Sequence, residues 1–410
     1  MTAAPAPATE VLVVGAGPAG SATALRLARA GVAVTLVDRA AFPRDKACAE
    51  YMSPETVRQL DLLGVLPALD AAGGHALVGT DLTAARGARL AGRFALASPR
   101  PFRPTGLSLA RRVLDVTLLD AARAAGVTVL ERAAVEELLY ERGAVAGALV
   151  RLDDGARRAV RARLTIGADG LRSVVARRLG GVRHGWPRRL GLVAHVADVA
   201  DLGPSAEMHV GRAGYVGLNP IGGGLANVAL VVPAARAAAL RGRAADFFFE
   251  TLETFPGVAG RIARARAVDA PRATGPFAQR ATRVVADGAL LVGDAAEFFD
   301  PFTGEGICTA LRGAALAAEV AAAALRDGPG TIASARRLDG YRALRRQAFA
   351  GKWAVERLVG WAMEWPALFD RAVGRLGRRP AMAHTFIGVT GDFVPARAVL
   401  DPRFLARLVL

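Results

Sequence analysis

Two hydrophobic patterns alternate near the start of the chain, and together they predict a strand, a glycine turn, a helix and a second strand. Val11–Val14 is a short β-branched run, as expected for a strand buried on both faces. Pro18 opens an Ala- and Leu-rich segment that predicts a helix up to Gly31. Residues 32–37 then return to a strand pattern that ends at Asp38. The rest of the chain is organised around this unit.

Later stretches of the chain show the same two hydrophobic patterns, that of a helix and that of a strand, in another order. Residues 107–126 have the amphipathic pattern of a helix, and residues 135–164 alternate around a Gly-containing turn, which predicts a three-stranded meander. Residues 80–104 and 185–275 contain alternating segments separated by Gly and Pro, so we expect a mainly antiparallel sheet there. Within the second stretch, residues 234–252 look helical and should cover one face of that sheet.

The residues of the glycine turn are the types that a dinucleotide site requires. Gly15 can adopt backbone angles that a side chain forbids, Gly17 lets a phosphate approach the main chain, and Gly20 lets the helix pack closely on the strand. The N–H groups and the positive dipole end of the helix would then face a pyrophosphate. Asp38 can accept hydrogen bonds from a ribose 2′-hydroxyl. We therefore expect an adenine dinucleotide here.

Two later motifs place an acid at the end of a buried strand. In Gly167-Ala168-Asp169-Gly170, the acid between glycines can approach a ligand's hydroxyls without steric hindrance. Gly293-Asp294 is followed by a loop that contains Pro301 and by a long helix from about Gly306. Asp294 can bind a ribityl chain, and the helix N-terminus can face the pyrimidine end of a flavin and favour its anionic reduced form. These motifs argue for FAD as a resident cofactor.

Composition limits the classes of protein to which the chain can belong. It has 410 residues, of which 52% are hydrophobic, and a formal net charge of +16. These values predict two closely packed domains rather than a disordered or fibrous chain. Arginine supplies nearly all of the charge and is scattered among acids without stacking aromatics, which argues against nucleic acid as a partner. Anionic substrates or an acidic membrane surface fit this pattern better.

Cysteine usage and the distribution of apolar runs predict a cytoplasmic protein. Cys48 and Cys308 are the only cysteines, so we expect neither a metal cluster nor a disulfide framework. Residues 1–9 lack the basic start and the apolar core of a signal peptide. No apolar run is expected to cross a bilayer, since the Ala-rich segment 314–325 carries Glu319. The oligomeric state is left open.

Polar residues outside the motifs are weaker candidates. Arg44, in the polar loop of residues 42–54, could bind a phosphate or could simply belong to a solvated crossover. A catalytic thiol at Cys48 has little support because no His follows it nearby. The expected sheet carries candidates for contact with a substrate, although half-buried sheets often hold such residues for structural reasons. These candidates are His195, His209, Tyr215 and Asn219.

Taken in this order and at these separations, the motifs resemble the p-hydroxybenzoate hydroxylase-type FAD-dependent oxidoreductases and monooxygenases over about residues 8–330. The resemblance implies an α/β fold. A Rossmann-like, glutathione reductase-type FAD-binding domain would be interrupted by a mainly antiparallel β-sheet substrate domain and followed by a C-terminal helical region. The FAD-binding domain would comprise residues 8–79, 105–180 and 276–330, the substrate domain 80–104 and 181–275, and the helical region 331–410.

The resemblance also implies roles for individual residues. Arg111 matches an arginine on the helix that borders the flavin in this family, and Asp169 lies in a motif that serves both FAD and NAD(P)H. Arg111 should also pair with Asp115, one helical turn away. The expected cofactor-binding residues are Gly15, Gly17, Pro18, Ala19, Gly20, Asp38, Arg39, Arg44, Cys48, Ala49, Arg111, Asp169, Gly170, Gly293, Asp294, Pro301, Gly304, Gly306 and Ile307.

Two further segments are similar to the geranylgeranyl reductase-like branch of this family. They are Lys46-Ala47-Cys48-Ala49-Glu50 and Gly214-Tyr215-Val216-Gly217-Leu218-Asn219-Pro220. That branch usually has Gly where Ala49 stands and Trp and Phe in the second segment, where this chain has Gly217 and Asn219. The Trp-x-Trp-x-Ile-Pro segment of flavin halogenases is missing from the sequence.

The cofactor leads to two expected reactions. The first choice is an NAD(P)H-dependent monooxygenase that hydroxylates an aromatic or polyketide-type small molecule through a flavin C4a-hydroperoxide. The alternative is an FAD-dependent ene-reductase or dehydrogenase of an isoprenoid or unsaturated lipid. Neither reaction needs a nucleophilic side chain or a metal, so the absence of such a motif from the sequence does not count against an enzyme.

A third hypothesis is a non-catalytic flavin-binding or membrane-surface protein. Residues 336–376 are basic, should be helical and carry Trp353, Trp361 and Trp365. Such a segment could lie on a membrane. Tryptophans at these spacings more often pack a helix against the core, and we favour that interpretation.

Overall fold

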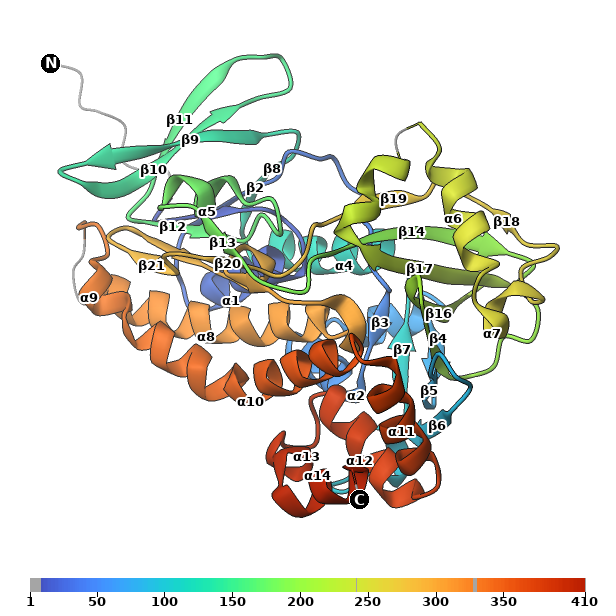
Figure 1. Cartoon of the computed structure of the whole chain (residues 1–410). Helices are drawn as coiled ribbons and strands as arrows, with labels where there is room; N and C mark the ends of the chain where they lie inside the picture. The colour runs from blue at the N-terminus through green and yellow to red at the C-terminus, as the bar shows by residue number, and fades with distance from the viewer. Residues whose placement is uncertain (1–8, 241, 327–329, 410) are drawn as a thin grey trace, which may run out of the picture.

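The computed structural model describes residues 9–240, 242–326 and 330–409. A six-stranded sheet, with five strands parallel, carries the N-terminal unit (Figure 1). Val11, Leu12 and Val13 have no exposed surface, as predicted for a strand covered on both faces. The strand order is β21 (Val285–Ala286), β22 (Ala289–Leu291), β12 (Leu164–Gly167), β1 (Val11–Val14), β2 (Val34–Val37) and β8 (Thr128–Leu130).

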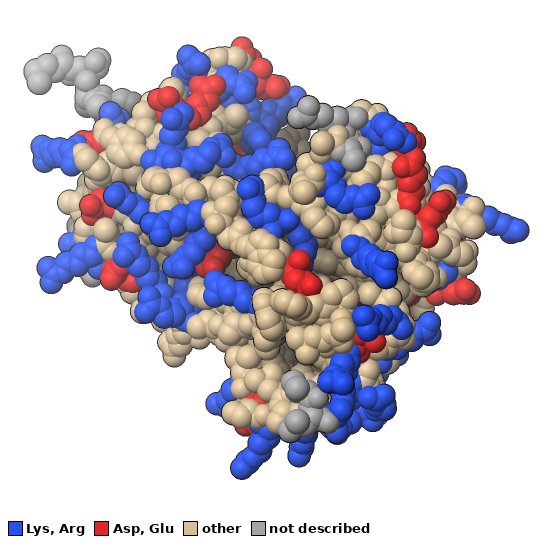
Figure 2. All heavy atoms as spheres, in the orientation of Figure 1, with Lys and Arg blue, Asp and Glu red and all other residues tan. Residues whose placement is uncertain are grey.

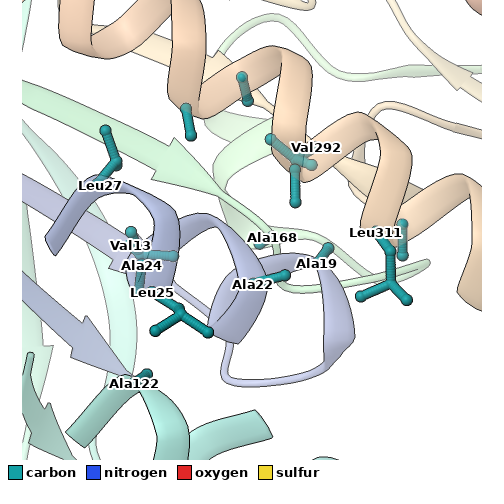
Figure 3. Close-up of a cluster of buried hydrophobic side chains, with 14 of the residues drawn as sticks. Val13, Ala19, Ala22, Ala24, Leu25, Leu27, Ala122, Ala168, Val292 and Leu311 are labelled. Carbon is teal, nitrogen blue, oxygen red and sulfur yellow. The ribbon is translucent and has the colours of Figure 1, made fainter. Parts of the chain in front are cut away.

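The two faces of this sheet are covered by different layers because side chains alternate along each strand. Val11 and Val13 pack against helices, whereas Leu12 and Val14 pack against the meander. The helical layer consists of α1 (Pro18–Arg29), α4 (Arg111–Ala124) and α8 (Gly306–Arg326). Figure 3 shows α1 between Ala122 of α4 and Leu311 of α8. The other layer is the predicted meander of β9 (Ala134–Glu141), β10 (Ala144–Arg151) and β11 (Arg157–Arg161), with α5 (Val174–Arg178) beside it.

A second, larger sheet contains most of the alternating segments. It is antiparallel apart from the parallel contact between β15 and β5. Its strands, in order, are β18 (Arg266–Ala267), β14 (Arg189–Ala197), β17 (Leu225–Pro233), β16 (Gly214–Gly222), β15 (Ala206–Gly211), β5 (Gly79–Thr83) and β6 (Arg89–Arg93), and β19 (Arg272–Thr274) also pairs with β14. Strands from residues 80–104 therefore share a sheet with those from residues 181–275, and α6 (Ala244–Leu252) and α7 (Pro256–Ala259) cover one face.

Two small sheets connect the large layers. One contains β3 (Tyr51–Met52), β7 (Gly106–Ser108) and β4 (His75–Leu77), and the other contains β13 (Val182–His184), β20 (Gln279–Ala281) and β23 (Glu297–Phe298). The remaining helices are α2 (Pro54–Leu62), α3 (Leu66–Ala71), α9 (Ala335–Leu338), α10 (Gly340–Ala362), α11 (Pro366–Gly377), α12 (Pro380–Thr390), α13 (Arg397–Leu400) and α14 (Pro402–Val409). Of these, α10 lies along α8, and α11 and α12 pack on β6 (Figure 1).

The structure corrects three expectations. The helix predicted at residue 107 begins at Arg111, because Leu107 pairs with β3 and β4. The helical stretch predicted at residues 234–252 begins with a short 3₁₀ segment, and α6 starts only at Ala244. Finally, α8 is long and apolar enough to cross a membrane by length and composition, although no such run was expected. In this fold α8 is a core helix that packs against α1 and α10.

Candidate functional site

The glycine turn between β1 and α1 has the backbone geometry that its sequence predicts. Gly15 has φ +99°, and its N–H donates to the carbonyl of Val37 (2.7 Å). A Cβ on Gly20 would lie 1.7 Å from the carbonyl oxygen of Gly15, so any side chain there would push the helix off the turn. Gly17 precedes α1 and has no side chain that could cap it. The N-terminus of α1 therefore keeps free N–H groups for an anion.

Two guanidinium groups lie beside this turn. A Cβ on Gly17 would be 3.6 Å from Nη2 of Arg44 and 3.8 Å from Nη2 of Arg111. Asp115, which is fully buried, holds both: its carboxylate accepts two 2.8 Å hydrogen bonds from Arg111 and lies 3.0 Å from Nη1 of Arg44. Burial lowers the pKa of Arg111, but the Asp115 carboxylate outweighs this, so the guanidinium stays charged. The turn thus faces two fixed positive charges, which suits a pyrophosphate.

Asp38 is buried at the end of β2, and its carboxylate binds the backbone of the glycine turn. Oδ2 accepts a hydrogen bond from the N–H of Ala16 (2.7 Å), and Oδ1 accepts one from the N–H of Ala40 (2.8 Å). A carboxylate oxygen has further lone pairs, so these bonds leave capacity for a ribose hydroxyl. Arg39 is exposed and does not line the cavity described below.

Asp294 and Lys46 face one another across the cavity. No hydrogen bond holds the Asp294 carboxylate among the described residues, and it lines the cavity wall. Burial raises the pKa of Asp294, while Lys46 and Arg111 oppose that rise. Lys46 is exposed to the open cavity, but the surrounding protein and the charge of Arg111 lower the pKa of its ammonium. An unsatisfied acceptor beside cations fits a hydroxyl-rich ligand, such as a ribityl chain.

The N-terminus of α8 closes one end of the cavity. Pro301, Gly304, Gly306 and Ile307 all line it, and Gly304 has φ +72°, which ends the short 3₁₀ turn Pro301–Thr303. Gly293 has φ +61° and supports the turn behind Asp294. A helix N-terminus carries partial positive charge, so this end of the cavity favours an anionic group.

Asp300 fixes the loop that precedes α8. Its Oδ1 accepts hydrogen bonds from the hydroxyl of Tyr215 (2.6 Å) and the N–H of Phe302 (3.0 Å), and Oδ2 accepts one from Arg189 (2.7 Å). Arg189 also pairs with Glu364 of the C-terminal region. The hydroxyl of Tyr215 is therefore committed to the fold, although its ring lines the cavity.

Asp169 is largely occupied within its own motif. It accepts hydrogen bonds from Ser173 (2.5 Å) and from the N–H of Val174 (2.6 Å), and so caps the start of α5. Burial raises its pKa, and these hydrogen bonds oppose the rise. Gly170, with φ +75°, is the part of the motif that lines the cavity. A direct role of the Asp169 side chain toward NAD(P)H stays a prediction.

The cavity contains about 1200 Å³ of unoccupied space, including its open mouth, and extends from the glycine turn to the large sheet. The sheet contributes a wall of small and apolar residues, and Thr274 and the engaged Tyr215 are the only polar side chains it places there among the described residues. That wall consists of Gly191, Val193, Met208, Tyr215, Gly217, Ala229, Val231 and Thr274, and Phe277, just after β19, extends it.

The loop with Cys48 and Ala49 lies between these two halves, and polar residues of the sheet anchor it. Asn219 donates to the carbonyl of Ala49 (2.8 Å), and Asn227 donates to the carbonyl of Cys48 (2.9 Å). Cys48 and Ala49 line the cavity, but Asn219 does not. Its side chain positions the loop, and its contact with a substrate stays a prediction. His209 also lies outside the cavity lining, because its ring pairs with Glu207 (2.9 Å).

Glu50 and His195 form a second anchor that the sequence did not single out as a pair. Glu50 is buried, has φ +56°, and accepts hydrogen bonds from the N–H of Arg111 (2.7 Å) and from Asn227 (3.1 Å). Nε2 of His195 lies 2.8 Å from Oε2 of Glu50, the oxygen that also accepts from Asn227, and this hydrogen bond raises the pKa of His195. Glu50 thereby ties the loop to α4, and His195 is a positioning residue rather than a substrate contact.

These features fit FAD in its expected orientation. Gly17, Pro18, Ala19, Arg111, Gly170 and Asp294 line one continuous cavity with the N-terminus of α8. Gly15, Gly20 and Asp38 shape the turn beneath it, and Arg44 lies beside Gly17. The donor set provides cations and helix N–H groups for phosphates and a free carboxylate for hydroxyls.

Comparison with known proteins identifies the class of protein. A family model described as "FAD binding domain" matches residues 8–356. The chain belongs to this family, of the p-hydroxybenzoate hydroxylase type, and its relatives confirm the expected geranylgeranyl reductase-like branch. It is an FAD-dependent oxidoreductase with the expected α/β fold.

Two relatives illustrate the branch. A digeranylgeranylglycerophospholipid reductase of Methanococcoides burtonii is 31% identical over 77% of this chain and 75% of the relative. A menaquinone reductase of Mycolicibacterium smegmatis is 30% identical over 94% of this chain and 92% of the relative.

Solved structures share the fold. A geranylgeranyl bacteriochlorophyll reductase-like protein of Thermoplasma acidophilum has a TM-score of 0.77 at 24% identity and covers 98% of both chains. The myxobacterial chondrochloren halogenase has a TM-score of 0.79 at 24% identity, over 87% of this chain and 83% of that one.

Proposed function

We propose that this protein is an FAD-dependent reductase that saturates a double bond in an isoprenoid chain. The observation that carries the proposal is the wall that the large sheet adds to the cavity. It offers an extended apolar surface and no charged group among the described residues. A small phenol would need a polar partner to orient its hydroxyl, whereas a polyprenyl chain is held by apolar contact along its length.

Small residues give that wall its room. Gly191, Gly217 and Ala229 lie on neighbouring strands, and a Cβ on Gly217 would still be 3.8 Å from Met208 and 3.9 Å from Ala229. The space left by these residues continues to Cys48 and the N-terminus of α8, where the flavin end of the cofactor is expected. A chain lying in it would reach the cofactor without meeting a charged side chain of the sheet.

Once reduced by its electron donor, bound FAD would supply a hydride to one alkene carbon, and a proton from water would complete the addition at the other carbon. The protein contributes binding, orientation and exclusion of water. Arg44, Arg111 and the α1 N-terminus would bind the phosphates, Asp294 would orient the ribityl chain, and the positive N-terminus of α8 would favour negative charge at the flavin end. We propose NAD(P)H as the electron donor.

The names of the relatives support the same proposal. The archaeal relative reduces a digeranylgeranyl lipid, and the mycobacterial relative is a menaquinone reductase that matches almost the whole chain. The halogenase structures are below 25% identity and support the fold alone. The monooxygenase that the sequence favoured stays a prediction, and no observation at the site favours an aromatic or polyketide substrate over a prenyl chain.

The experiment is anaerobic incubation of the FAD-loaded, chemically reduced protein with menaquinone or a geranylgeranyl lipid, followed by mass spectrometry of the lipid. The proposal expects a gain of two hydrogens per double bond reduced. The same protein mixed with oxygen and phenols should give no oxygenated product. Oxygenation of a phenol, with the prenyl lipid unchanged, would overturn the proposal in favour of the monooxygenase.

A further inference from the structure

A basic cleft lies outside the cavity, between α10 on one side and β20 with residues 282–284 on the other. It contains about 980 Å³ of unoccupied space, including its open side, and adjoins a second cleft with about 850 Å³, which shares Arg280 and Glu297 with it. Figure 2 shows basic side chains outnumbering acidic ones over this face of the molecule. The arginines that line the two clefts are Arg183, Arg280, Arg283, Arg342, Arg345, Arg346 and Arg357.

Few of these charges are neutralised within the fold. Glu297 is the only acid that lines either cleft among the described residues, and it pairs with Arg357 at 3.2 Å. Within the same part of the chain no carboxylate forms an ion pair with the four central arginines. These are Arg280, Arg283, Arg345 and Arg346. Such a concentration of unpaired positive charge attracts an anion.

Arg345 shows that this charge is built into the fold rather than scattered over the surface. Only 7% of the residue is exposed, although it lines the cleft. Its guanidinium stacks on Tyr341 and Trp353, with 5.8 and 5.5 Å to the ring centroids, and it has no acidic partner in the described chain. Burying a cation without a carboxylate is costly, so the position points to an external anion as its partner.

Exposed tryptophans surround the second cleft. Trp186 is 61% exposed and Trp361 is 46% exposed, and both line this cleft; Trp365, 58% exposed, lies 6.3 Å from Trp361 between ring centroids. The interpretation that Trp361 and Trp365 pack their helices against the core is therefore wrong. Tryptophan is enriched where an apolar phase meets water, because its ring is apolar and its N–H is polar.

The second cleft also adjoins the flavin cavity. Phe298 of β23 lines both the cavity and the tryptophan-lined cleft. An apolar chain that leaves the cavity past Phe298 would emerge between tryptophans and arginines. The molecule thus offers an apolar path, then tryptophans, then arginines. This order matches the hydrocarbon, interfacial and charged headgroup regions at the surface of an anionic bilayer.

We propose that this face docks on a phospholipid bilayer, with the arginine cleft binding the phosphate of an anionic lipid headgroup and Trp186 and Trp361 lying at the lipid–water boundary. The docking site goes beyond the proposed reaction and does not depend on it. Association with a membrane can be measured without turnover, so the two proposals fail separately.

The test is co-sedimentation of the FAD-loaded full chain with phosphatidylcholine vesicles, with and without phosphatidylglycerol. We expect binding only to the anionic vesicles and a decrease with added salt. Arg280 and Arg346 are both exposed, so replacing either one by Gln should leave the core folded. Arg280→Gln and Arg346→Gln should each lower the ratio of vesicle-bound to free protein about fivefold, as expected for the loss of one charge near an anionic surface. Arg345→Gln should do the same while its circular dichroism and FAD content stay those of the parent.

Arg158→Gln is the matched control, since Arg158 is exposed and lies in the meander on another part of the molecule. Equal loss in this variant would mean that net charge alone drives binding and would overturn the site. Binding unaffected by phosphatidylglycerol would do so as well. If NADPH or inorganic phosphate binds the parent but not Arg345→Gln, and vesicles bind neither, the cleft is a site for soluble phosphates and the membrane proposal is wrong.

Discussion

The two halves of the cavity use polar groups in opposite ways. On the nucleotide side, Arg44 and Arg111 are held rigid by Asp115, and the Asp294 carboxylate is left free to bind. On the sheet side, Asn219, Asn227 and the Tyr215 hydroxyl bind the protein itself, and the wall is apolar. One half is therefore prepared for a charged, hydroxylated cofactor and the other for a hydrophobic chain. Changes in the two halves should have separable effects.

Loss of Asp115 should produce the largest effect. Asp115→Ala leaves two cations without their buried carboxylate, and breaking such an arrangement costs about 3–5 kcal/mol in free energy of unfolding. The Asp115→Ala variant should also lose FAD, because the guanidinium groups of Arg44 and Arg111 are no longer held in position. Denaturant unfolding and flavin absorbance check this. Asp120→Ala, in the same helix with an exposed ion pair to Arg123, is the control and should cost no more than about 1 kcal/mol.

Filling the sheet side should abolish turnover without releasing FAD. Gly217→Leu places a side chain in the apolar wall and should slow reduction of a prenyl substrate by at least about a hundredfold, because the substrate cannot reach its position. Flavin content should equal that of the parent. Gly203→Leu is the matched control, since no atom lies within 4 Å of a Cβ built there. If Gly217→Leu loses flavin instead, the two halves are not separable.

Asp294 and Asp38 should behave differently, although both are acids at strand ends. Asp294→Ala should weaken FAD about tenfold, the effect of one hydrogen bond to a charged group, and leave the apoprotein at least as stable as the parent, because no hydrogen bond of the fold is lost. Asp38→Ala removes the acceptor of two backbone N–H groups and should cost both FAD and about 1–3 kcal/mol of stability. Flavin titration and unfolding of the apoproteins distinguish them.

The Glu50–His195 contact should give an effect that is visible as a pH dependence of stability. Glu50 raises the pKa of His195 above its usual 6.5, so the contact stabilises the folded protein fully below that value. This contribution is lost as the pH rises through the higher pKa of the folded state. Glu50→Gln should therefore reduce the unfolding free energy by about 1–3 kcal/mol at acid pH and by less at alkaline pH. Glu137→Gln, at an exposed ion pair, should show no such difference.

The sequence predicted the parts of the site that depend on local geometry. The glycine turn, the strands ending near Asp38, Asp169 and Asp294, and the helix after Gly306 depend on residues a few positions apart, and each lies where expected. The Arg111–Asp115 pair, one helical turn apart, is another such case. Local spacing determines these contacts, so the sequence alone can predict them.

Long-range partners could not be predicted in the same way. His209 and Asn219 were expected to contact a substrate, but Glu207 binds the first and the carbonyl of Ala49 accepts from the second. The Glu50–His195 contact joins residues 145 positions apart, and its only local signal is an acid directly after the loop containing Cys48. The basic cleft depends on α10 lying beside β20, which no periodicity in either segment reveals.

The most direct test of the division between the two halves is anaerobic reoxidation of the reduced flavin, recorded in the parent and in Gly217→Leu. The account predicts that a prenyl substrate reoxidises the flavin of the parent without oxygen. In Gly217→Leu, it should leave an equal amount of bound flavin reduced. Equal reoxidation in both proteins would contradict the account. So would a parent protein whose flavin the prenyl substrate does not reoxidise and which only oxygen reoxidises.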